Sequence, residues 1–184
     1  MSTWELPTTA CIGGRVYPIH TDYRDVLNIF KHLDDPGQPE YVRWRIALAL
    51  FYEGDIPTEH MAEAMAYLAE FISCGRQDSR PGPKLLDWEQ DAQTIVADVN
   101  RVAGTEIRAL PFLHWWTFLS YFHAVGEGQL STLIAIREKL RTGKKLEAWE
   151  QDYYRKNKER VDLKKQYSAQ EKEEQARLKA LLGM

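Results

Sequence analysis

Cysteine is scarce in this chain, which has only Cys11 and Cys74 among 184 residues. Two cysteines so far apart form neither a disulfide framework nor a recognisable zinc-binding motif. An excess of one charge is also lacking, because 24 Lys and Arg residues nearly balance 27 Asp and Glu residues. The formal net charge of −3 gives no electrostatic footprint for nucleic acid. We therefore expect neither a disulfide-stabilised secreted protein nor a nucleic-acid-binding protein.

Long apolar runs are missing as well. No stretch of 18 apolar residues occurs, so no membrane-spanning helix is expected. Residues 1–7 have neither the basic residues nor the apolar core of a secretion signal. Hydrophobic residues make up 44% of the chain and charged residues 28%, which is typical of a globular protein. These features predict a protein of a reducing cytoplasm, with one domain or one domain plus an appendage.

The sequence also lacks any assembled catalytic motif. The pair Gly13-Gly14 lacks the strand–glycine–helix context of a phosphate-binding loop. His60 and Glu63 are spaced to share one face of a helix, but no second carboxylate–histidine pair completes a dimetal site. No serine lies in a nucleophile-elbow motif. We therefore expect no enzyme, no cofactor and no metal site.

Aromatic residues, in contrast, are concentrated in residues 111–125. Six of them lie between Phe112 and Phe122, including the adjacent pair Trp115 and Trp116. Trp115, Phe118 and Phe122 fall on one helical face together with Leu119. This pattern predicts a helix buried at the centre of the core. The alternative is an exposed aromatic patch that binds a partner.

Most of the remaining sequence has helical periodicity, so the predicted fold class is mostly α. Residues 8–20 form two short extended runs around Gly13-Gly14, which predicts a β-hairpin. Asp87 to Gln90 has the form of a capping box that would begin a helix at once. The apolar periodicity predicts helices over about residues 22–35, 40–52, 58–72, 88–99, 111–125 and 130–140.

Residues 147–184 differ in composition, with eight acidic and nine basic residues and glycine only at position 183. This composition predicts a long charged helix, and we divide the chain into a core domain, residues 1–145, and an arm, residues 146–184. Leu146, Trp149 and Tyr153 are expected to dock on the core, and residues beyond about 160 to be exposed. The arm either orders against a partner or is a solvated helix. Trp149, Tyr153 and Tyr167 are the candidate partner-binding residues.

Three segments, taken in order, carry a further signal. Their residues are Thr21, Asp22 and Arg24 after the hairpin, Trp88 and Asp91 in the middle, and His114, Trp115, Trp116 and Phe118 in the aromatic stretch. Together these segments resemble the gp-fifteen family of tailed-bacteriophage proteins. The resemblance runs from about residue 6 to 160, with His-Trp-Trp-x-Phe as its most specific part. The chain departs from the family pattern at two places: the sequence of residues 103–107, and a loop at residues 75–83 that is rich in proline and glycine.

The resemblance implies a function that the residues alone do not. Members are encoded by siphophages and prophages of Gram-positive bacteria and resemble tail assembly chaperones. The implied role is non-enzymatic shielding of the tape-measure protein in the host bacterial cytoplasm, with possible self-association. The alternative is a minor structural virion protein of the tail or its joining region; a single hairpin argues against a β-rich tail-tube subunit. A helix-turn-helix regulator would need a more basic recognition helix than any helix predicted here.

Overall fold

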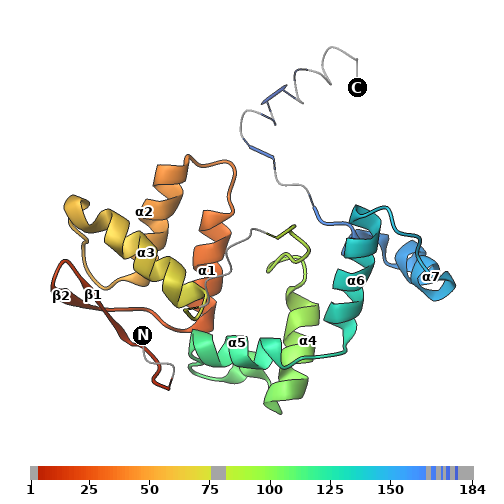
Figure 1. Cartoon of the computed structure of the whole chain (residues 1–184), viewed down its shortest axis with the longest axis horizontal. Coiled ribbons are helices and arrows are strands. Elements are labelled where there is room, and N and C mark those ends of the chain that lie inside the picture. The colour runs from red at the N-terminus through yellow and green to blue at the C-terminus, as the bar shows by residue number, and fades with distance from the viewer. Residues whose placement is uncertain are drawn as a thin grey trace. The chain divides into compact units, whose positions relative to one another are not determined.

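The computed structural model describes residues 4–75 and 82–164, and then residues 167, 168, 171, 173, 174 and 177. These residues contain eight α-helices and one two-stranded antiparallel sheet, which confirms the predicted mostly α architecture (Figure 1). The described chain divides into two compact units. We call residues 4–75 the N-terminal unit and residues 82–164 the central unit.

The N-terminal unit begins with the predicted hairpin, formed by β1 (Thr9–Ile12) and β2 (Arg15–Pro18). Gly13 and Gly14 have φ values of 57° and 78°, so both turn residues occupy the left-handed region that a tight hairpin turn requires. Side chains alternate between the two faces, and Ala10, Ile12 and Tyr17 are buried. The Tyr67 hydroxyl donates to the Thr9 carbonyl at 2.9 Å, which attaches the hairpin to the third helix.

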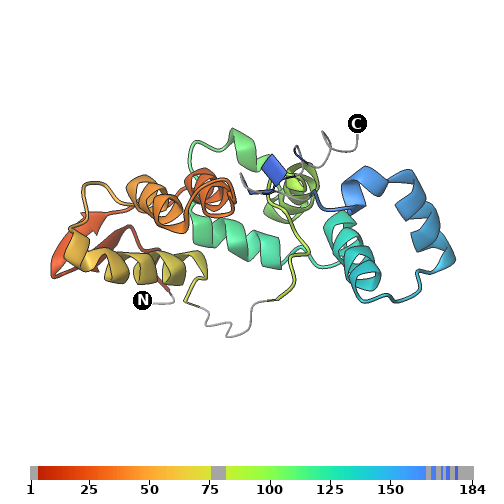
Figure 2. The same ribbon diagram turned by 90° about the horizontal axis from the view of Figure 1, so that it is seen from above.

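Three helices complete this unit: α1 (Tyr23–Leu33), α2 (Glu40–Phe51) and α3 (Met61–Ile72). They agree closely with the predicted ranges because their ends are set by local signals, such as the Asp22 cap and the Pro36-Gly37 turn. Helices α1 and α2 lie side by side, and α3 lies in the next layer (Figure 2). Their apolar faces form one core, which includes Val26, Ile29, Leu48, Phe51, Ala64, Leu68 and Phe71.

The central unit consists of α4 (Ala92–Ala103), α5 (Trp115–His123), α6 (Gln129–Arg141), α7 (Ala148–Lys156) and the short α8 (Lys158–Val161). In α5, Trp115, Phe118 and Leu119 are buried, as the aromatic pattern predicted. The Trp88 ring lies 6.0 Å from the Trp115 ring and 6.3 Å from the Phe118 ring. The core interpretation therefore describes this side of α5 correctly.

The capping box predicted at Asp87 differs in the structure. The Asp87 carboxylate does accept from the Gln90 backbone N–H at 2.8 Å, but α4 begins only two residues after Gln90, at Ala92. The Asp87 backbone N–H donates to the Asp91 carboxylate at 2.9 Å, not to the Gln90 side chain. Gln90 is engaged elsewhere: its side-chain amide donates to the Asp162 carbonyl at 2.8 Å.

The single long helix predicted from residue 147 is wrong for the described residues. Helix α7 ends at Lys156, and the side-chain amide of its cap residue Asn157 donates back to the Tyr153 carbonyl at 2.9 Å. The chain then turns through α8 and buries Val161 against Leu133 and Ile136, together with Leu146. Residues 146–164 therefore lie in the central unit, so the structure does not divide the chain near residue 145.

The predicted docking residues are only partly correct. Leu146 is buried and Tyr153 packs on the cluster around Leu133, whereas Trp149 is 55% exposed. Val161, beyond the position where we expected exposure to begin, is 1% exposed. Most of the predicted arm after residue 164 lies outside the described residues. No helix within residues 4–75 or 82–164 is long and apolar enough to cross a membrane.

We predict that Trp115→Ala lowers the free energy of unfolding by about 3–5 kcal/mol, because the indole is 1% exposed and its removal leaves a cavity. Trp116→Ala is the matched comparison, since that side chain is only half-buried, and its cost should be smaller. Urea denaturation followed by circular dichroism measures both. Equal losses would contradict this placement of the two indoles.

Candidate functional site

The first group of family-motif residues organises the start of α1. The Asp22 carboxylate accepts from the Arg24 backbone N–H at 2.9 Å and from the Arg24 guanidinium at 2.7 Å. This ion pair raises the pKa of the Arg24 guanidinium above its usual range. Thr21, just before the cap, is buried. These three residues therefore begin and orient the helix.

Trp88, from the second group of family-motif residues, packs against the aromatic residues of the third group in the core of the central unit. His114 is the N-cap of α5, and its Nδ1 atom accepts from the Trp116 backbone N–H at 3.1 Å. Trp115 and Phe118 extend inward from the first turn and contact Trp88. The His-Trp-Trp-x-Phe motif thus combines a helix cap with the aromatic residues that the cap positions.

Asp91 forms a buried ion pair with Arg137, a residue that the sequence analysis missed. The Arg137 Nη1 atom lies 2.6 Å from Asp91 Oδ2, and the two side chains are 4% and 2% exposed. The guanidinium also donates to the carbonyls of Leu85, Arg160 and Val161 at 2.7–2.9 Å. One feature of the sequence indicates that Arg137 is buried, because it falls on the apolar face of α6 with Leu130 and Leu133.

A second ion pair holds α7 against α6. The Lys139 ammonium lies 2.7 Å from the Glu150 carboxylate, which is buried and also accepts from the Glu147 backbone N–H at 2.8 Å. The hydrogen bond from Lys139 holds the pKa of the Glu150 carboxyl below its usual value. This contact places the first turn of α7, from which Trp149 extends; Tyr153 follows one turn later.

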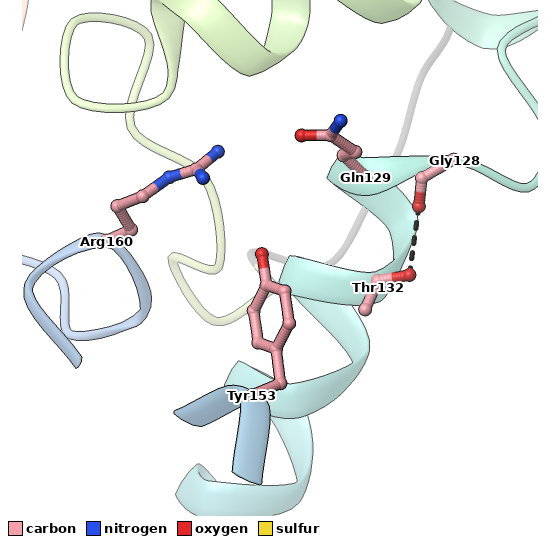
Figure 3. A pocket seen from close by; sticks show the side chains of 5 residues that line it. All are labelled: Gly128, Gln129, Thr132, Tyr153 and Arg160. Atoms are coloured by element: carbon pink, nitrogen blue, oxygen red, sulfur yellow. Dashed lines mark hydrogen bonds between the residues drawn. The ribbon is translucent and has the colours of Figure 1, made fainter. Parts of the chain in front are cut away.

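An open groove of about 380 Å³ lies between the N-terminal half of α6 and the α7–α8 segment (Figure 3). The Tyr153 hydroxyl, the Arg160 guanidinium and the Gln129 amide point into the space between these elements (Figure 3). The Arg160 side chain is positioned by its bond to Thr94 Oγ1 at 2.9 Å. The groove is lined by Gly128, Gln129, Thr132, Tyr153 and Arg160.

The start of α6, which lines this groove, depends on a close approach at Gly128. A Cβ atom at this position would lie 2.7 Å from the Asp98 carboxylate, closer than nonbonded atoms allow. That carboxylate accepts from the Leu130 backbone N–H at 2.9 Å and so binds the first turn of α6 to α4. The Thr132 hydroxyl donates to the Gly128 carbonyl at 3.0 Å (Figure 3).

The groove has the chemistry of a binding site. Arg160 and Gln129 supply hydrogen-bond donors, and Tyr153 supplies an aromatic ring with a hydroxyl at its tip. No cluster of three or more histidine, cysteine, aspartate or glutamate residues that could hold a metal ion occurs in the described part of the chain. His60 and Glu63, the pair that we considered for a metal, contact the hairpin turn, where Gly13 N–H donates to Glu63 at 2.9 Å.

The three candidate partner-binding residues are not brought together. Tyr153 lines the groove, whereas Trp149 is exposed near the start of α7, with its indole N–H donating to Glu147 at 3.0 Å. Tyr167 is half-buried and lies in neither a helix nor a strand. Sequence reasoning did not find Gln129 or Arg160. Both are distant from Tyr153 along the chain or separated from it by the turn after α7, and only the fold brings the three together.

Comparison with known proteins identifies one family. A family model described as Bacteriophage Gp15 protein matches residues 4–163. No curated protein and no solved structure matches the chain. The matched range includes every family-motif residue and every residue that lines the groove.

We predict that Asp91→Ala lowers the free energy of unfolding by about 3–5 kcal/mol, because it leaves the Arg137 charge buried without its carboxylate. Asp152→Ala is the control, since it removes an exposed carboxylate that pairs with Arg155 and Lys156 and should cost at most about 1 kcal/mol. Chemical denaturation of both variants measures the difference. A loss for Asp91→Ala as small as that of the control would contradict a structural role for the buried pair.

Proposed function

The protein belongs to the bacteriophage Gp15 protein family, whose model covers most of the chain, and from this premise we propose that it is a non-enzymatic phage assembly protein. Its action would consist of binding other proteins. The groove supports this proposal because its donors and its aromatic ring suit recognition of a protein surface. Tyrosine and arginine are among the residues that most often dominate binding energy at protein interfaces.

The specific role that we propose is that of a tail assembly chaperone for the tape-measure protein. A tape-measure protein is a long, largely helical chain with apolar stripes, which would aggregate in the host cytoplasm before the tail tube forms around it. A small helical protein can cover such stripes reversibly, because burial of a helix face in a groove requires no covalent step. The groove between α6 and the α7–α8 segment would be the contact surface.

The contacts around the groove favour tight recognition. The Arg160 guanidinium donates to Thr94, and the Arg160 carbonyl accepts from Arg137 at 2.7 Å. Both the backbone and the side chain of Arg160 are thereby held before a partner arrives. A positioned side chain loses less conformational entropy on binding than a free one, which strengthens the complex.

A minor structural role in the virion, in the tail or its joining region, is the second candidate. It also fits membership of a phage family and would use the same kind of protein contact. The two roles differ in what happens after assembly: a chaperone leaves the particle, whereas a structural protein remains in it.

We predict that Arg160→Ala and Gln129→Ala each weaken binding of the tape-measure protein about tenfold, because each removes a donor from the groove. Arg155→Ala is the matched control, since this arginine is 78% exposed on α7 and does not line the groove. Isothermal titration with a soluble tape-measure fragment measures the affinities. Equal weakening by the control would place the contact outside the groove.

We predict that the protein is required for soluble tape-measure protein during co-expression but is absent from purified virions. Quantitative mass spectrometry of the virions, with the major tail protein as the internal standard, checks the second part. A fixed number of copies in each particle would reject the chaperone role and favour the structural one.

A further inference from the structure

An exposed group of two lysines and one tryptophan lies between α6 and α7. Lys144 and Lys145 occupy the connecting turn, and Trp149 follows in the first turn of α7. All three are exposed, and neither lysine forms an ion pair within the described residues. The Trp149 indole, 55% exposed, is steadied by its hydrogen bond to Glu147. We call Lys144, Lys145 and Trp149 the basic edge.

The N-terminal unit has a surface of opposite character. Residues 46–75 contain five acidic residues and no lysine or arginine. Three of the acids, Glu53, Asp55 and Glu59, are exposed in the segment that joins α2 to α3. Asp55 lines a small recess of about 90 Å³, and Glu53 and Glu59 are close in sequence to its lining residues Gly54 and Met61. The recess is lined by Arg45, Leu48, Ala49, Gly54, Asp55, Ile56 and Met61. We call this recess with its three acids the acidic recess.

We propose that the basic edge of one copy of this chain docks on the acidic recess of a second copy. The two surfaces match in charge, since two ammonium groups would face three carboxylates. They also match in polarity, because the Trp149 indole would cover the apolar lining formed by Leu48, Ile56 and Met61. Arg45, the one basic group of the recess, suits an indole because a guanidinium stacks favourably on its face.

The association needs both the charge contact and the apolar contact. Exposed ion pairs contribute little to stability because water and salt screen them, so the lysines mainly set orientation and partner choice. Burial of the exposed indole supplies the apolar contribution. Association should therefore weaken when either the salt concentration rises or the indole is removed.

The contact joins two different surfaces, so its symmetry differs from that of an ordinary dimer. Each copy that donates its basic edge still has an unused recess. Such a heterologous contact extends into a chain or closes into a ring. The inference does not depend on the tape-measure protein, because the contact requires only copies of this chain.

The test is the molar mass of the purified full chain, measured by light scattering over a series of protein concentrations. At about 0.05 M salt the mass should increase beyond that of a monomer, and at about 0.5 M salt it should fall, because screening shortens the reach of the charges. Trp149→Ala should raise the dissociation constant at least about tenfold. A monomer at every concentration and salt level would overturn the proposal.

A charge exchange identifies the surfaces. The double variant Lys144→Glu with Lys145→Glu and the double variant Glu53→Lys with Asp55→Lys should each remain monomeric. An equimolar mixture of the two should associate again, because each variant then meets a partner of opposite charge.

Lys158→Glu with Lys164→Glu is the matched control for this exchange. It makes the same change in net charge within the same unit and should associate like the wild type. Circular dichroism confirms that every variant is folded. Folded variants whose mixture stays monomeric, or a control that dissociates as fully as the edge variant, would reject these surfaces.

Discussion

The buried pair of Asp91 and Arg137 is the constraint on which the central unit depends. Two charges removed from water are tolerated only when each finds enough partners, and Arg137 needs its carboxylate and three carbonyl oxygens. Those partners come from the segment before α4 and from the end of α8. The guanidinium is therefore satisfied only when both segments reach α6 together, so the pair specifies how these elements assemble.

The groove is a consequence of this assembly. Arg137 fixes the carbonyls of Arg160 and Val161, and Gln90 binds the next residues through Asp162 and the Lys164 N–H. The chain after α7 is thus held close to α4, which brings Arg160 to one wall of the groove. The opposite wall is α6, so the binding surface is formed by segments that the sequence keeps far apart.

Features set by near neighbours could be predicted from the sequence, and those set by distant partners could not. The Gly13-Gly14 turn and the three helices of the N-terminal unit follow local rules and were predicted closely. The break at Asn157 was missed because Val161 gains its burial from Leu133 and Ile136 on another helix. Of the groove residues only Tyr153 was anticipated, from its apolar spacing, since the position of Arg160 depends on Thr94 and Arg137.

Gly128 is the groove residue whose substitution the structure tolerates least. Any side chain at this position would collide with Asp98, which holds the start of α6 on α4. Gln129 is exposed on the helix beyond it, so its replacement leaves that junction intact. Binding preferences can therefore change through the exposed side chains of the groove while the junction of α6 with α4 stays fixed.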